Sequence, residues 1–205
     1  MVAALKNAIN AEHGSALEMT DVQVVSTADL TVDQGIGDRL LCPLTLDLPE
    51  TLTFPAQALF SACRDVAGLR RQLEAWQYST GEGDFWLPIV LTAKGALYGE
   101  VIGAEKNAVV ESTARASSYT QPVHLSDRQR QPLYALGQRL LRSLNAPPAV
   151  YLMQFGWQDG AVCFDRLLPF PAAPAIASLT VQTPDLFACH WACLTNQPIL
   201  DLVIG

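Results

Sequence analysis

Apolar and polar positions follow two different periods along the chain, and each change of period predicts a different element. Over residues 66–76 the apolar side chains recur every three or four positions, which is typical of a helix with one buried face. A leucine stripe over 133–144 predicts a second helix. Between them, residues 86–91 and 97–102 are apolar runs separated by a Lys-Gly turn, which predicts a β-hairpin.

A second hairpin is predicted near the C-terminal end. Residues 150–155 and 161–167 are apolar runs, and Asp159-Gly160 between them favours a tight turn because both positions tolerate positive φ. Residues 108–112 form a further short apolar run that predicts another strand of the same sheet.

Cap residues predict where the helices begin. The helical period begins after Pro55, and Asp65 is expected to cap the second half of this helix. Pro132 is expected in the first turn of the leucine-rich helix, where a missing backbone N–H costs nothing. Thr183 is expected to cap a last helix with Pro184 at its first position.

The order of these elements, β-β-β-α-β-β-loop-α, predicts an α+β fold with packed helices on an antiparallel sheet. We divide the chain into a lobe, 85–205, and an N-terminal segment, 1–84, of unknown role that is expected to pack on the same core. Within that segment, residues 19–53 favour short extended stretches joined by turns around Gly35 and Gly37.

Composition and charge exclude some classes of protein and partner and indicate the compartment in which we expect the chain. Half of the 205 residues are apolar and only 16% are charged, which excludes a disordered protein. The net charge of −7 argues against nucleic acid as a partner, because such binding rests on neutralising phosphates. Residues 167–184 carry no charge, but four prolines exclude an uninterrupted membrane helix. The first apolar residues are interrupted at once by Lys6 and Asn7, which leaves a run too short for a signal peptide, so we expect a cytoplasmic protein.

The five cysteines are an odd number and lack the close spacing of a disulfide framework, which indicates free thiols in a reducing compartment. Cys189, His190 and Cys193 raise a metal hypothesis, because positions i and i+4 share a helix face. Zinc would need a fourth ligand, and His124 and Cys163 are the obvious donors. Core packing is the interpretation we adopt, and no cofactor is expected.

A series of residues after the leucine-rich helix has the spacing of a known enzyme family. Gln154-Phe155 is followed twelve residues later by Arg166, then by Pro169-Phe170-Pro171, Gln182, Phe187, His190 and Pro198. This frame resembles the C-terminal part of the ATP-grasp domain of carboxylate–amine ligases. The similarity is to formate-dependent glycinamide ribonucleotide transformylase and carboxyaminoimidazole ribonucleotide synthase. It implies an ATP-grasp-like lobe over 85–205.

The departures from that family are at the ligand positions. The resemblance implies two glutamates that hold Mg²⁺, yet these positions are occupied by Gln154 and Arg166. Leu168 stands for the family's asparagine and Phe170 for its substrate-binding arginine. Asp165 is one residue out of register, and a strict strand alternation would turn it to the opposite face. The resemblance therefore predicts a pseudoenzyme rather than an active ligase.

The function expected from the sequence is binding, as an assembly or regulatory factor for a protein partner. Phe170 is expected to point outward from the proline-rich loop 167–174 and to take part in an interface, unless these apolar side chains fill the old cleft. The candidate residues for an interface or a vestigial cleft are Gln154, Arg166, Leu168, Phe170, Gln182 and His190.

Two alternatives stay open. The chain is a ligase-like enzyme with an altered active site, or one completed by another subunit, in which case Glu100, Glu105 and Glu111 are the nearest carboxylates. Alternatively, the high apolar fraction indicates self-association as a homodimer.

Overall fold

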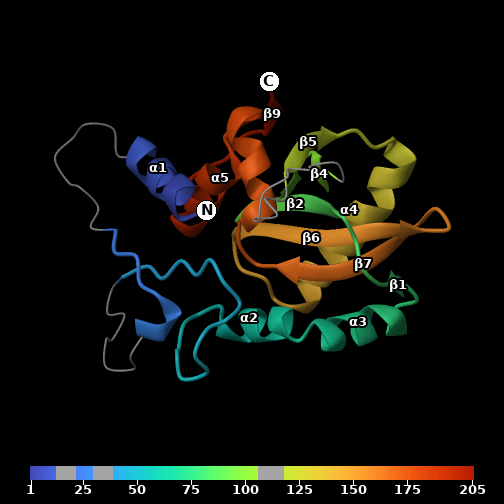
Figure 1. Cartoon of the computed structure of the whole chain (residues 1–205), viewed down its shortest axis with the longest axis horizontal. Helices are drawn as coiled ribbons and strands as arrows, with labels where there is room; N and C mark the ends of the chain where they lie inside the picture. Colours follow the sequence, from blue (N-terminus) through green and yellow to red (C-terminus); the bar gives the residue numbers. More distant parts are fainter. Residues whose placement is uncertain (13–21, 30–38, 106–117) are drawn as a thin grey trace, which may run out of the picture.

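A computed structural model describes residues 1–12, 22–29, 39–105 and 118–205 (Figure 1). The predicted strand at 108–112, the turns around Gly35 and Gly37, and the candidate carboxylate Glu111 lie outside these residues. The described part confirms a mixed fold in which helices pack on a mostly antiparallel sheet.

The main sheet has the strand order β1-β7-β6-β2-β4-β5, with β3 paired to β2, and only the β1–β7 pair is parallel. A separate two-stranded ladder joins β8 to β9. The strands are β1 (Ser79–Thr80), β2 (Phe85–Thr92), β3 (Gly95–Tyr98), β4 (Val101–Ala104), β5 (Tyr119–Val123), β6 (Ala149–Gln158), β7 (Ala161–Leu168), β8 (Gln182–Thr183) and β9 (Val203–Ile204).

Helices surround the sheet, with α2 and α3 along one side and α1 beside α5 on another (Figure 1). Their bounds are α1 (Val2–Glu12), α2 (Gln57–Arg64), α3 (Val66–Ala75), α4 (Asp127–Ser143) and α5 (Leu186–Leu194), with 3₁₀ turns η1 (Thr27–Asp29) and η2 (Ala173–Thr180). No helix within the described ranges is long and apolar enough to cross a membrane.

Both predicted hairpins are confirmed. β2 pairs with β3, and the pair next to the turn is Thr92 with Gly95. Asp159 and Gly160 have φ of 52° and 78° between β6 and β7, the geometry that favours Asp-Gly. The predicted strand over 97–102 is instead two strands, β3 and β4, because the chain bends after Tyr98 and both pieces pair with β2.

Of the three predictions about where helices begin, one is confirmed and two are wrong. Asp65 caps α3 by accepting a hydrogen bond from the backbone N–H of Gly68 at 2.8 Å. Pro132 lies inside α4 and not in its first turn, because the helix begins earlier, at Asp127. Thr183 lies in β8, and the cap of α5 is Asp185, whose carboxylate accepts from the second and third N–H groups after it.

Apolar side chains fill both faces of the sheet. We call the side covered by α3 and α4 the α4 face, and the side covered by α5, α1 and residues 42–60 the α5 face. Along β6, Tyr151 and Met153 point to the α4 face while Val150 and Leu152 point to the α5 face. Both clusters contain side chains from the N-terminal segment, and the division at residue 84 stays a prediction.

Candidate functional site

Gln154 and Arg166 lie directly opposite each other on β6 and β7. The side chain of Gln154 donates from Nε2 to the carbonyl oxygen of Gly83 at 2.6 Å. Arg166 keeps 44% of its side chain exposed. The structure thus brings together the two residues that the sequence placed at the family's ligand positions.

A β-bulge changes the orientation of Asp165. Gln154 pairs with Arg166 but Phe155 pairs with Phe164, so Asp165 is the extra residue of β7. The bulge breaks strict alternation, and the Asp165 carboxylate accepts a hydrogen bond from Arg166 Nε at 3.2 Å. The expectation that Asp165 turns to the opposite face was therefore wrong.

Asp165 is the residue that sequence reasoning missed. Its side chain is 3% exposed, and its Oδ1 receives Arg70 Nη2 at 2.6 Å. Arg70, on α3, also donates from Nε to the Asp165 carbonyl oxygen at 3.1 Å and from Nη2 to the Gly81 carbonyl oxygen at 3.2 Å. The other carboxylate oxygen accepts from the backbone N–H of Gly83 at 3.1 Å. The guanidinium therefore joins α3, the bulge and the segment 81–84.

The segment 81–84 runs from β1 to β2 directly against β6. A Cβ added at Gly83 would meet the backbone carbon and oxygen of Phe155 at 2.0 and 2.1 Å. One added at Gly156 would meet the carbonyl oxygen of Glu82 at 2.9 Å. Glycine at both positions lets the two backbones touch, and this contact covers β6 next to Gln154.

These residues do not fit a magnesium ion. Mg²⁺ needs several oxygen ligands, preferably carboxylates. Gln154 offers a neutral amide, Arg166 is a cation, and Asp165 is already bound to Arg70. In the part of the chain that the structure describes, no three His, Cys, Asp or Glu side chains form a group that could hold a metal ion.

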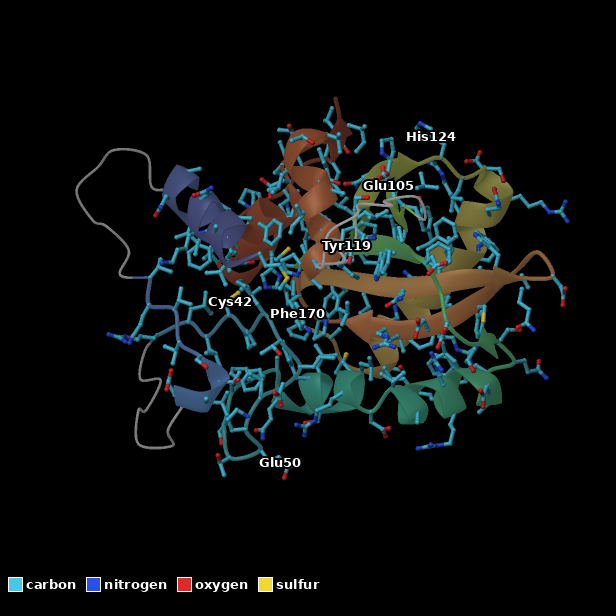
Figure 2. The ribbon with its side chains drawn as sticks, viewed as in Figure 1. Cys42, Glu50, Glu105, Tyr119, His124 and Phe170 are labelled. Atoms are coloured by element: carbon cyan, nitrogen blue, oxygen red, sulfur yellow. The ribbon has the colours of Figure 1, made fainter. Side chains whose placement is uncertain are left out.

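Phe170 does not point outward as the sequence predicted. It is 5% exposed, and its ring stacks on Phe60 with a centroid separation of 6.1 Å. Phe60 in turn meets Phe54 edge to face at 5.3 Å. Figure 2 shows Phe170 in the interior, and the flanking prolines of its loop are buried as well. Aromatic side chains of the N-terminal segment cover this loop, so Phe170 and the half-buried Leu168 fill the α5 face.

Gln182, the first residue of β8, makes buried polar contacts. Its Oε1 accepts from Gln121 Nε2 at 3.2 Å, and its own Nε2 donates to the Pro184 carbonyl oxygen at 2.9 Å. Gln182 and Gln121 are each 5% exposed. These bonds tie β5 to the start of α5, which is a structural role.

His190 supports the sheet from α5. Its Nδ1 accepts from the backbone N–H of Val150 at 3.1 Å, at the end of β6 that extends beyond β7. The side chain is 3% exposed, and burial lowers its pKa from 6.5 to about 4. The neighbouring Cys189 and Cys193 are buried free thiols, and burial raises the pKa of Cys193 to about 11.

The stability of the protein should fall by about 3 kcal/mol between pH 6.5 and pH 4 because of His190. In this window the unfolded chain binds a proton at this histidine and the folded chain does not, so lowering the pH favours unfolding. Urea unfolding across the window measures the slope. In His190→Leu this slope should flatten, whereas the control His124→Leu, on an exposed histidine (Figure 2), should keep it. Equal slopes in wild type and His190→Leu would refute the assignment.

Comparison with known proteins shows the fold. No family model matches the chain, and no curated protein does. Among solved structures it is similar to the glycinamide-RNase-transformylase T from Mycobacterium tuberculosis, with TM-score 0.58 and 16% identity over 72% of this chain and 53% of that one. It is also similar to N5-carboxyaminoimidazole ribonucleotide synthetase from Thermus thermophilus, with TM-score 0.58 and 9% identity over 72% of this chain and 56% of that one.

A third similar structure is the phosphoribosylaminoimidazole carboxylase ATPase subunit from Aquifex aeolicus. Its TM-score is 0.57 at 11% identity, over 77% of this chain and 57% of that one. These are ATP-grasp enzymes, so the resemblance stated from the sequence is confirmed at the level of the fold. The chain spans a little over half the length of the structures that it matches.

Proposed function

We propose that this protein is a non-catalytic member of the ATP-grasp-like folds and acts by binding a protein partner, in assembly or regulation. One observation carries the proposal: the buried carboxylate next to the ligand positions, Asp165, is already neutralised by Arg70. Beside the positions at which the resemblance implies bound Mg²⁺, the positive charge is therefore supplied by a guanidinium of the chain itself.

Electrostatics favours the same conclusion. An incoming Mg²⁺ would meet Arg166, a permanent cation, where the family has a carboxylate. Like charges a few ångströms apart repel by several kcal/mol in a partly buried site. No remaining carboxylate on β6 faces that position to offset the repulsion, since Gln154 is neutral.

The packing of the α5 face supports a protein partner over a small ligand. Leu44, Leu46, Phe54 and Phe60 cover the strands on which the resemblance places ATP and its metal. Recognition by this protein would then use its outer surface, where a protein can bind. The five free cysteines suit a reducing compartment, and we propose the cytoplasm.

Titration with Mg·ATP in a calorimeter should show no saturable heat up to about millimolar nucleotide, because the site lacks ligands and carries cations. The double variant Gln154→Glu with Arg166→Glu places carboxylates at both positions, and it separates missing ligands from the covering of β6 by segment 81–84 as the cause of the silence. It should also stay silent, because the segment 81–84 still lies against β6. Micromolar binding by the wild type would overturn the non-catalytic proposal.

The second candidate is a ligase-like enzyme with an altered active site or one completed by another subunit. The ATP-grasp-like fold favours it. Of the acidic residues suggested for it, Glu100 pairs with Arg130 at 3.1 Å. Glu105 accepts hydrogen bonds from Ser118 and Thr120, which lower its pKa. Nucleotide that co-purifies with the native protein, detected by mass spectrometry, would favour this candidate.

A further inference from the structure

A hollow of about 730 Å³ lies between β5 and η2. β5 is the last strand of the main sheet, beside β4 (Figure 1), and η2 packs against both strands. β5 contributes Tyr119 and Gln121 to the wall of the hollow, and η2 contributes Ala173, Ile176 and Ala177. A concave site of this size, with apolar side chains and a few polar groups, is typical of a site for a small molecule.

One buried polar atom of this wall has no hydrogen-bond partner. Gln121 is 5% exposed, and its Nε2 donates to the carbonyl oxygen of Glu100 at 3.0 Å and to Oε1 of Gln182 at 3.2 Å. The Oε1 atom of Gln121 is also buried, and no donor in the described part of the chain reaches it. A buried acceptor without a donor is costly and rare in native proteins, so we expect a donor from outside the chain.

The neighbours of the Gln121 amide fix which of its atoms is left unpaired. Gln182 donates from its own Nε2 to the carbonyl oxygen of Pro184 at 2.9 Å, so its Oε1 is the atom that faces Gln121. Exchanging the oxygen and nitrogen of the Gln121 amide would set its oxygen against two acceptors. The unpaired atom is therefore an acceptor, and its ligand must be a donor.

The charge around the hollow favours an uncharged ligand. None of the described residues that line it is charged. Ser118 and Thr120 line it and donate from their hydroxyls to the carboxylate of Glu105, so the adjoining charge is negative. A phosphate or carboxylate would find no cation here for a charge-assisted hydrogen bond.

We propose that this hollow binds an uncharged small molecule in which an N–H or O–H donor is joined to an apolar group. The donor hydrogen-bonds to Oε1 of Gln121, and the apolar group lies against Ala173 and Ala177 of η2. Because Oε1 is buried, η2 moves slightly outward when the ligand binds. The site goes beyond the proposed protein partner and does not depend on it, since neither Gln154 nor Arg166 lines the hollow.

Three probes of similar shape test the site on the full chain. Benzamide carries an N–H donor, acetophenone has a methyl group in its place, and benzoate has a charged oxygen there. In a titration followed by nuclear magnetic resonance, benzamide should shift the backbone amides of Gln121 and Ala177 with about millimolar affinity, as expected of a fragment. Acetophenone should bind about tenfold more weakly because it leaves the acceptor unpaired, and benzoate should not bind.

Ala177→Leu fills the hollow at a residue that makes no hydrogen bond with Gln121, and it should weaken benzamide binding at least about tenfold. Ala135→Leu is the matched control, because this alanine is exposed on α4, and it should bind benzamide as the wild type does. Gln121→Met removes the acceptor at similar volume and should bind benzamide and acetophenone alike. Circular dichroism checks the fold of each variant, and Ala177→Leu keeps the test decisive if Gln121→Met does not fold.

The absence of a saturable shift with benzamide up to about 10 mM would overturn the proposal and would leave an ordered water as the donor to Oε1. Equal affinities of the wild type for benzamide and acetophenone would overturn it as well, because the buried acceptor would then take no part. Benzamide binding that is unchanged in Ala177→Leu would place the probe elsewhere and would also contradict it. The Mg·ATP titration is independent of these results, so the two proposals fail separately.

Discussion

Replacing Asp165 by alanine is expected to lower the free energy of unfolding by about 3–5 kcal/mol. The substitution leaves the guanidinium of Arg70 without its carboxylate, and the backbone N–H of Gly83 without its acceptor. We expect the lower part of this range because 29% of the Arg70 side chain is exposed and water can solvate part of its charge. The contact of Asp165 with the more exposed Arg166 adds little to this loss of stability. Urea unfolding followed by tryptophan fluorescence measures the loss.

The control for this prediction is Asp47→Ala, at an exposed aspartate, which should change stability by no more than about 0.5 kcal/mol. Arg70→Met combined with Asp165→Ala should cost less than the two single changes together, because the second change no longer strands a charge. Strict additivity would show that the two side chains do not stabilise each other.

Phe170→Ala is expected to cost about 3–5 kcal/mol, because the ring is 5% exposed and stacks on Phe60. The cavity would lie on the α5 face between the sheet and the N-terminal segment. Differential scanning calorimetry and urea unfolding measure the loss, while light scattering should show the same oligomeric state as the wild type.

Phe54→Ala is the graded control, since Phe54 is only partly buried against the same cluster, and its cost should be smaller. A loss below about 1 kcal/mol for Phe170→Ala, accompanied by loss of association, would contradict the placement of the ring in the core. That result would restore the outward orientation that the loop sequence suggested.

Local patterns predicted the elements whose stability is decided locally. The Asp-Gly turn, the leucine stripe of α4 and the capping aspartate of α3 each depend on residues within one turn of one another. The N-cap of α5 was misplaced by two residues because Thr183 and Asp185 are both good caps, and only the pairing of β8 with β9 decides between them.

The sequence predicted which residues occupy the candidate site but not the contacts that they make. The resemblance placed Gln154 and Arg166 at the family's two ligand positions, and the structure brings them directly opposite each other. The bulge at Asp165 could not be read from spacing, because one extra residue leaves no periodic signal in so short a strand. Its partner Arg70 is 95 residues away in the sequence, so no local pattern connects the two.

The direction of Phe170 depends on packing from a distant part of the chain. Proline on both sides fixes φ but does not decide which face the intervening side chain takes. The aromatic residues Phe54 and Phe60 decide it, and they belong to a segment to which the sequence assigned no role. The sequence did contain a hint of this orientation, because Phe54 and Phe60 supply two aromatic rings that could cover the ring of Phe170.

Residues 42–60 are tethered to the sheet face that they cover, and this makes them an intramolecular competitor for any ligand of that face. A linked segment meets its site at an effective concentration on the order of millimolar, whatever the concentration of the protein. The apparent affinity of a free ligand is reduced by the small fraction of time for which the face is vacant. Cutting the chain after residue 60 would therefore release an occupant and uncover an apolar surface, which favours aggregation over nucleotide binding.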